Sequence, residues 1–332
     1  MQKILTISIA AYNMEQYLDE ALSSLIDPAC IDLLDVIVVN DGSTDKTPEV
    51  AAKYVEKYPD SFRLINKENG GYGSTINCAL KYARGSYIKL LDGDDWYETG
   101  HLAAYLQYLQ ETDFDMVFTP YSRFEGDAGR LKKVVSLPYA PYAALRREDL
   151  TDISMYFVAV RTELVRENVS ITEHCFYTDV EWCFKTVLCC RSFVTLPISI
   201  YCYRLGRAGQ SVSVEGYLRH IAEHAYISKL AASLFVENDC LSGLEGKVSG
   251  YLERTYLYLL KSKRTMKNVG ALLTFRQFIK KKGSFSIPHM RKNIRTVLTF
   301  PFLMILPYPT IEKLFRRGHQ VKAYGRKLCH RQ

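Results

Sequence analysis

The feature that most constrains this chain is a regular alternation of short apolar runs with longer amphipathic segments through its N-terminal third. Apolar runs rich in β-branched residues predict strands at 3–11, 33–39, 62–66 and 86–92. The amphipathic segments predict helices at about 14–26, 47–58 and 74–83. Because these strands are apolar throughout rather than at alternate residues, both of their faces must be covered. Such strands are typical of a parallel sheet with helices on either side.

The pattern becomes mixed after about residue 115. Strand-like runs at 115–124 and 194–204 flank a helical run at 181–190, so we expect the sheet to continue there. Beyond residue 215 the periodicity is helical, as in 216–238 and 250–263. We therefore predict an α/β fold with a Rossmann-like mixed, mostly parallel sheet flanked by helices, followed by a C-terminal helical region.

The length of 332 residues allows one large domain with an appendage. Hydrophobic residues at 48% and charged residues at 24% are in globular proportions, which argues against intrinsic disorder. We place the α/β domain at 1–214, with halves at about 1–97 and 98–214, and the helical region at 215–332.

The central motif is Asp92-Gly93-Asp94-Asp95, which sets three carboxylates within four residues directly after a predicted buried strand. Like charges this close repel one another, which raises the pKa of at least one carboxyl unless a cation compensates. Oxygen ligands suit a hard divalent ion, and such an ion together with a diphosphate would turn the crowding into binding. An acidic turn that caps a helix is the competing interpretation.

Three further motifs follow the other predicted strands, at the edge of the sheet where ligands bind in folds of this class. Tyr12 offers an aromatic face for a nucleobase, and Asp41 offers a carboxylate that can accept from an imide N–H. The pair Gly70-Gly71 supplies backbone that a ligand can approach closely. A surface tyrosine, a turn before a capped helix and a glycine turn are the competing interpretations. The glycines do not match the GxGxxG fingerprint, which disfavours a hydride-transfer enzyme.

The order and spacing of these four motifs together resemble the family 2 glycosyltransferases with the GT-A fold, over about residues 3–215. The resemblance implies inverting transfer of a sugar from a nucleotide diphosphate to an acceptor hydroxyl. The residues that it implies for the nucleotide, usually a uridine diphosphate, are Ala11, Tyr12, Asn13, Asp41, Gly70, Gly71, Asp92 and Asp94. It implies a metal site at Asp92 and Asp94, shared by Asp95, with Mg²⁺ or Mn²⁺ as the ion.

The sequence departs from the family pattern at two of these positions. Asn40 stands where many relatives carry a second aspartate, which leaves Asp41 as the residue expected to recognise the base. Ala10-Ala11 replaces the commoner Pro-Thr, a change of small effect if the backbone makes the contact.

A general base must take the proton of the acceptor hydroxyl during attack, and Thr178-Asp179-Val180-Glu181 offers two carboxylates for this purpose. The resemblance implies Asp179 as the base, with Thr178 in the place of the usual glutamate and Glu181 as the fallback. The competing interpretation is that Thr178 and Asp179 only begin and cap a helix.

The stretch 204–213 combines arginines, glycines and small polar residues, which suits a mobile loop that closes on a diphosphate. The residues that we expect to act in this loop are Arg204, Arg207, Gln210 and Ser211. A flexible linker between the α/β domain and the helical region is the alternative.

The C-terminal part is strongly basic, with 18 lysines and arginines and one acidic residue from 261 to 332. Within it, residues 297–311 are apolar but shorter than the roughly 20 residues of a membrane-spanning helix, and prolines interrupt them. We predict that this segment makes peripheral contact with an anionic membrane and so reaches a lipid-linked acceptor. A buried core helix with a basic face is the alternative. Nucleic-acid binding is disfavoured because no motif for it is present.

The nine cysteines form no CxxC pair, and Met1-Gln2-Lys3 runs directly into the first predicted strand without a signal peptide. We therefore expect a reduced, cytoplasmic protein, with peripheral association at the inner face of the plasma membrane.

The favoured function is transfer of a sugar from a UDP-sugar onto a glycan, either a cell-surface polysaccharide or a lipid-linked precursor. A non-catalytic partner that binds nucleotide sugars or carbohydrate would keep the same fold, although the intact Asp92, Asp94 and Asp179 argue against it. A sugar nucleotidyltransferase would also use metal-bound carboxylates, but no Gly-rich basic phosphate loop stands before Ile26.

Overall fold

The computed structural model describes residues 2–125, 130–207, 210–262 and 266–281. The chain divides into two compact units, the first made of residues 1–210 and 240–244 and the second of 211–239 and 245–332. The predicted domain boundary between residues 214 and 215 stays a prediction. The apolar segment at 297–311, for which we predict membrane contact, lies outside the described residues.

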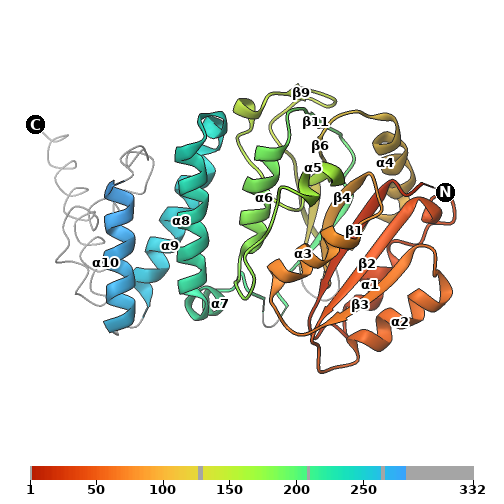
Figure 1. Ribbon diagram of the computed structural model, residues 1–332, viewed down its shortest axis with the longest axis horizontal. Coiled ribbons are helices and arrows are strands. Elements are labelled where there is room, and N and C mark those ends of the chain that lie inside the picture. The colour runs from red at the N-terminus through yellow and green to blue at the C-terminus, as the bar shows by residue number, and fades with distance from the viewer. Residues whose placement is uncertain (1, 126–129, 208–209, 263–265, 282–332) are drawn as a thin grey trace, which may run out of the picture. The chain divides into compact units, whose positions relative to one another are not determined.

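The described part of the first unit is built on an eight-stranded sheet (Figure 1). Its strands are, in spatial order, β3 (Phe62–Lys67), β2 (Leu34–Asp41), β1 (Leu5–Ala11), β4 (Tyr87–Asp92), β10 (Val158–Arg161), β6 (Met116–Phe118), β11 (Phe193–Thr195) and β9 (Ala144–Leu145). Neighbouring strands are parallel from β3 to β4 and between β6 and β11, whereas β10 is antiparallel to both of its neighbours. This arrangement confirms the predicted mixed, mostly parallel sheet.

A smaller sheet of the first unit was not separated from the large one by the sequence pattern. Its strands are, in spatial order, β5 (Trp96–Tyr97), β12 (Tyr201–Leu205), β7 (Tyr121–Glu125) and β8 (Arg130–Val135). The predicted runs at 115–124 and 194–204 each break into two strands that enter different sheets. Pro120 and Pro197 stand at these breaks, where a missing amide cannot continue a strand ladder.

Helices cover the large sheet as its continuous apolar strands require. The helices of the first unit are α1 (Leu18–Ser23), α2 (Thr47–Lys57), α3 (Tyr72–Tyr82), α4 (Thr99–Glu111), α5 (Thr162–Arg166) and α6 (Thr178–Cys189), with 3₁₀ turns η1 (Ile31–Leu33) and η2 (Arg147–Asp149). α3, α5 and α6 contact one another and α1 contacts α2, so the helices lie against the sheet in groups (Figure 1). Strands β1, β2 and β4 are buried along almost their whole length.

The helix predicted from Met14 is shorter than the pattern indicates, because α1 begins only at Leu18. Asn13, directly before the predicted start of that helix, has a positive φ of 53°. Its Oδ1 accepts a hydrogen bond of 2.8 Å from the amide of Thr44. Asn13 therefore joins the loop after β1 to the loop after β2.

The register of the strands gathers polar residues at one edge of the sheet. Ala10 in β1 pairs with Asp92 in β4, and Ala11 pairs with Asn40 in β2. Because these strands are parallel, their carboxyl ends share this edge. The fold therefore brings the loops after β1, β2, β3 and β4 together.

The second unit is helical in its described part. Its helices are α7 (Val214–Arg219), α8 (Ile221–Glu237), α9 (Glu245–Lys261) and α10 (Met266–Lys281), while the 3₁₀ turn η3 (Asp239–Leu244) falls mostly in the first unit. α9 contacts both α8 and α10. Among the described helices we find none with the length and apolar character needed to cross a bilayer.

Lys89 is a charged residue that lies fully buried in the middle of β4. Its Nζ donates to the carbonyl oxygens of Tyr156, at 2.9 Å, and Val158, at 3.2 Å. Burial lowers the pKa of the Lys89 ammonium to about 7. These bonds tie β4 to the segment that enters β10.

Replacement of Gly73 by alanine should destabilise the first unit by about 1–3 kcal/mol, because the new methyl would overpack α3. A Cβ there would lie 2.1 Å from the carbonyl oxygen of Thr172 and 2.8 Å from Ile171 Cγ2. Gly100 in α4 is the matched control, since a Cβ there meets no atom within 4 Å. Gly100→Ala should stabilise by up to about 1 kcal/mol. Urea unfolding measures both, and a wild-type midpoint for Gly73→Ala would contradict the packing.

The stability of the wild type relative to Lys89→Met should increase as the pH rises from 7 to 9. The pKa of Lys89 falls from 10.5 to about 7 on folding, so the unfolded chain binds the extra proton between these values. Raising the pH removes that advantage of the unfolded state and favours the folded one. Urea titrations of both proteins across this range would measure the difference, and a flat or falling difference would contradict the assignment.

Candidate functional site

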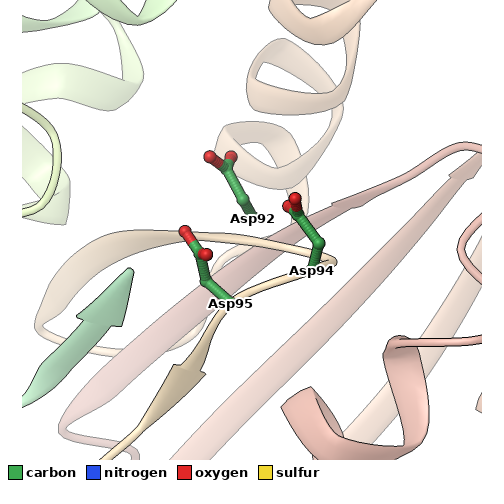
Figure 2. Close-up of side chains that lie close together, drawn as sticks. All are labelled: Asp92, Asp94 and Asp95. Carbon is green, nitrogen blue, oxygen red and sulfur yellow. The ribbon is translucent and has the colours of Figure 1, made fainter. Parts of the chain in front are cut away.

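Three carboxylates meet in the turn between β4 and β5, at the carboxyl edge of the large sheet (Figure 2). Asp92 ends β4, and Asp94 and Asp95 follow in the turn. The turn is closed by a hydrogen bond of 3.0 Å from the amide of Asp95 to the carbonyl oxygen of Asp92. One oxygen from each carboxylate lies within 4.8 Å of the other two, which is close enough for a shared cation.

The electrostatics of this turn differ between its members. Burial, and then the charge of Asp94, raise the pKa of Asp92, while the hydroxyl of Tyr72 acts in the opposite direction. Burial and the two neighbouring carboxylates raise the pKa of Asp95 well above its ordinary value. The turn therefore concentrates negative charge that the protein compensates only in part.

The residues of the turn fit a divalent cation. Oδ1 of Asp92 is buried and has no hydrogen-bond partner within the described part of the chain, so one ligand oxygen is left for an ion. Asp94 forms an ion pair with the guanidinium of Arg207, so an ion bound at Asp94 would share this carboxylate with Arg207. All the donor atoms are carboxylate oxygens, which are the ligands that Mg²⁺ and Mn²⁺ prefer.

Arg204 and Gln210 have surroundings unlike those expected for the mobile loop predicted at 204–213. Arg204 belongs to β12 and is buried, with its guanidinium paired with Glu20 and stacked over Trp96 at 4.7 Å. The side chain of Gln210 is buried and bonds back to the backbone, accepting from the Gly206 amide at 2.9 Å and donating to the Arg204 carbonyl at 2.7 Å. Ser211 belongs to the second unit. The strand therefore extends through the first residues of the expected loop.

Asp41 anchors the glycine loop after β3. Its Oδ1 accepts from the amide of Gly70 at 2.9 Å and from Lys67 Nζ at 2.8 Å, and its Oδ2 accepts from the amide of Gly71 at 2.8 Å. Gly71 has a φ of 81°, a conformation that favours glycine. Lys67 had no part in the sequence interpretation, because a lysine at the end of a strand reads as an ordinary exposed residue.

The loops after β1 and β2 are joined at the same edge. Ala11 is buried at the end of β1, and Tyr12 next to it is 48% exposed. The amide of Asn13 donates to Ser43 Oγ at 3.0 Å. Asn40 joins β2 to β3 because its Nδ2 donates to Asn66 Oδ1 at 2.9 Å. Tyr12 therefore presents an exposed ring next to two loops that are hydrogen-bonded to each other, those after β1 and β2.

Asp179 and Glu181 at the start of α6 have different environments. Glu181 is buried and already bound, because its Oε2 accepts from the Thr172 amide at 3.0 Å and its Oε1 pairs with Lys185 Nζ at 2.7 Å. Asp179 is half-buried, and its charge contributes to raising the pKa of Asp92. The structure therefore brings Asp179 within electrostatic reach of the acidic turn.

Several tyrosines that the sequence interpretation missed line this region. Burial, and then the charges of Asp92 and Asp179, raise the pKa of Tyr72 well above its ordinary value. The hydroxyl of Tyr201 donates to Asp95 Oδ2 at 2.6 Å. In the sequence Tyr201 looks like any apolar strand residue, so no local signal could have identified it. Tyr72 directly follows the glycine pair, which is the one clue that the sequence offers.

Comparisons by sequence place this chain among glycosyltransferases. The model of glycosyl transferase family 2 matches residues 6–168. The minor teichoic acid biosynthesis protein GgaB of Bacillus subtilis is 36% identical over 127 residues, which are 37% of this chain and 14% of GgaB. The putative glycosyltransferase EpsH of the same organism is 34% identical over 125 residues, which are 38% of this chain and 36% of EpsH. The matches thus cover well under half of either relative.

Comparisons by structure extend the likeness to nearly the whole chain. Residues 1–349 of Staphylococcus aureus TarS, solved in complex with UDP-GlcNAc, superpose with a TM-score of 0.67 at 20% identity, covering 95% of this chain and 92% of that one. The mannosyltransferase PcManGT from Pyrobaculum calidifontis, solved with GDP-Man and Mn²⁺, has a TM-score of 0.50 at 17% identity, covering 95% and 88%. Residues 6–168 of this chain therefore belong to glycosyl transferase family 2, on a fold that TarS and PcManGT share.

Proposed function

We propose that this protein transfers a sugar, with inversion at the anomeric carbon, from a UDP-sugar to the hydroxyl group of a glycan acceptor. The observation that carries the proposal is the placement of Asp179 within electrostatic reach of the Asp92–Asp95 turn. A cation-binding carboxylate cluster and a single separate carboxylate are the two parts that a direct displacement requires. TarS, which shares the fold, was solved with UDP-GlcNAc, and this supports a nucleotide-sugar donor.

The nucleotide would bind along the carboxyl edge of the sheet. Tyr12 supplies an exposed ring for the base, and Asp41 Oδ2 can accept a second hydrogen bond beside that from Gly71, as a carboxylate oxygen has two lone pairs. The neighbouring Asn13 and Ala11 shape the same edge. The ribose would lie near Asp92, whose buried Oδ1 has no partner among the described residues.

The diphosphate would lie over the acidic turn, with Asp92 and Asp94 holding Mg²⁺ or Mn²⁺. Such an ion, when bound, neutralises the charge that builds on the departing diphosphate. Arg207 lies beside Asp94 and offers a guanidinium that matches phosphate geometry. PcManGT, which shares the fold, was solved with Mn²⁺, and this supports the choice of ion.

Asp179 would act as the base. Its carboxylate takes the proton of the acceptor hydroxyl while the hydroxyl oxygen bonds to the anomeric carbon and the bond from that carbon to the diphosphate breaks. Glu181 is a poor alternative because its carboxylate is buried and bound by Thr172 and Lys185. The acceptor would be a cell-surface polysaccharide or a lipid-linked precursor, and the likeness to a teichoic acid biosynthesis protein supports this class.

The proposal is tested by incubating the protein with Mn²⁺, a panel of UDP-sugars and glycan acceptors. We expect UDP to be released and a glycoside of inverted anomeric configuration to form. NMR spectroscopy would detect both products and the configuration. Mn²⁺-dependent binding of UDP without any transfer would favour the non-catalytic binding partner instead. Absence of UDP binding with or without Mn²⁺ would overturn the assignment of the nucleotide site.

The Asp94→Asn variant should bind UDP in the presence of Mn²⁺ at least about 10-fold more weakly than the wild type, because it loses an anionic metal ligand. Isothermal titration measures the affinity. Asp60→Asn, at an exposed turn before β3, is the charge-matched control and should bind normally. Equal affinities for the Asp94→Asn variant and the wild type would exclude Asp94 from the metal site.

The Asp179→Asn variant should lower kcat by about 10²–10⁴-fold while leaving the affinity for UDP and Mn²⁺ within about twofold of the wild type. The amide keeps the shape of the side chain but cannot take the acceptor proton. Initial rates at saturating donor, together with titration of UDP, separate the two effects. A variant with normal turnover but weak UDP binding would move Asp179 from the base to the donor site.

A further inference from the structure

Asp95 is the member of the acidic turn whose carboxylate the protein itself already occupies. It is 1% exposed. Its Oδ2 accepts from the hydroxyl of Tyr201 at 2.6 Å, and its Oδ1 accepts from the amide of Arg204 at 2.7 Å. Both oxygens of this carboxylate are therefore directed at β12.

The direction of the Tyr201 proton follows from its second hydrogen bond. The amide of Asp92 donates to the Tyr201 hydroxyl oxygen at 3.2 Å. An amide can only donate, so the single proton of the phenol is left for Asp95. Tyr201 thus bridges the backbone at the start of the turn and the side chain at its end.

The ring of Tyr201 is packed against other aromatic rings, which fixes the position of its hydroxyl. It is fully buried, and the ring of Tyr156 lies 5.0 Å from it between centroids. The ring of Tyr97, its partner in the β5–β12 ladder, lies at 5.8 Å. Packing on several sides restricts the rotamer, which is what a support for a metal ligand requires.

Arg204 adds a third bond from β12 to the turn. Its Nε donates to the carbonyl oxygen of Asp94 at 2.9 Å. β12 therefore bonds to every one of the three acidic residues, to the backbone of Asp92 and Asp94 and to the side chain of Asp95. Among the described residues, the hydrogen bonds from β12 reach only the backbone of Asp92 and Asp94, so the strand leaves both carboxylates for other partners.

We infer that Tyr201 is a positioning residue for the metal site, holding Asp95 as a supporting carboxylate so that the cation is bound through Asp92 and Asp94. This inference rests on the proposed function. It replaces the expectation that Asp95 shares the metal. Residues that orient metal ligands without touching the metal commonly change metal affinity by 10–100-fold when altered.

The test compares Tyr201→Phe with Tyr97→Phe in the full-length protein. Each variant removes one buried hydroxyl and keeps the ring. The Tyr97 hydroxyl has no hydrogen-bond partner within the described residues, and its ring packs on Tyr201, so it controls for packing. Binding of Mn²⁺ in the presence of UDP is measured by electron paramagnetic resonance, and thermal unfolding is measured alongside.

We expect Tyr201→Phe to weaken Mn²⁺ binding by about 10-fold or more, with Tyr97→Phe within about twofold of the wild type. Raising the Mn²⁺ concentration should restore the turnover of Tyr201→Phe, since the defect lies in metal affinity. Wild-type Mn²⁺ affinity in Tyr201→Phe, or an equal loss in both variants, would overturn the inference. A wild type that binds no Mn²⁺ with UDP would overturn the proposed function itself.

Asp95→Asn provides a second route to the same test. Its amide group cannot accept from both Tyr201 and Arg204, so we expect a similar loss of Mn²⁺ affinity. The double variant Tyr201→Phe with Asp95→Asn should lose less than the sum of the two single losses, because the two residues share one hydrogen bond. Additive losses, or an Asp95→Asn variant with lost metal binding beside a normal Tyr201→Phe, would make Asp95 a direct ligand and overturn the inference.

Discussion

Repulsion among three carboxylates in one four-residue turn is the constraint on which the rest of the site depends. Each of the three carboxylates is compensated by a different set of contacts. Asp95 is bound by the hydroxyl of Tyr201 and an amide, Asp94 is paired with Arg207, and Asp92 keeps a buried oxygen without a partner among the described residues. The negative charge is thus compensated least where β4 ends. That difference makes Asp92 the carboxylate of the turn with the most unmet demand for a positive charge.

This compensation comes from a distant part of the chain. β12 lies more than a hundred residues after the acidic turn, and the family model ends at residue 168, before either β12 or α6. The matched segment therefore carries the acidic turn but not the strand that holds it or the carboxylate proposed as the base. The smaller sheet, whose β5 leaves the turn directly, is what brings β12 to this place.

Local patterns were enough to predict the parts of the fold and site that depend on neighbouring residues. The four apolar runs correspond to β1 to β4, and the acidic motif falls at the end of β4 as expected. The second sheet escaped prediction because Pro120 and Pro197 break runs that read as single strands. Tyr201 escaped because its role exists only through a partner far away in sequence. The sequence offered Glu181 as a fallback base because its hydrogen bond to Thr172 depends on tertiary packing, which local patterns do not show.

The glycine loop after β3 contacts the segment that leads to the proposed base, Asp179. Asp41 fixes the amides of Gly70 and Gly71, and the carbonyl oxygen of Gly70 accepts a hydrogen bond of 2.5 Å from the amide of His174. A Cβ at Gly71 would lie 3.3 Å from the nitrogen of His174, so only glycine allows this contact without displacement. α6 begins four residues later with Asp179 in its first turn, so a backbone hydrogen bond joins the glycine loop to the segment that leads to the proposed base.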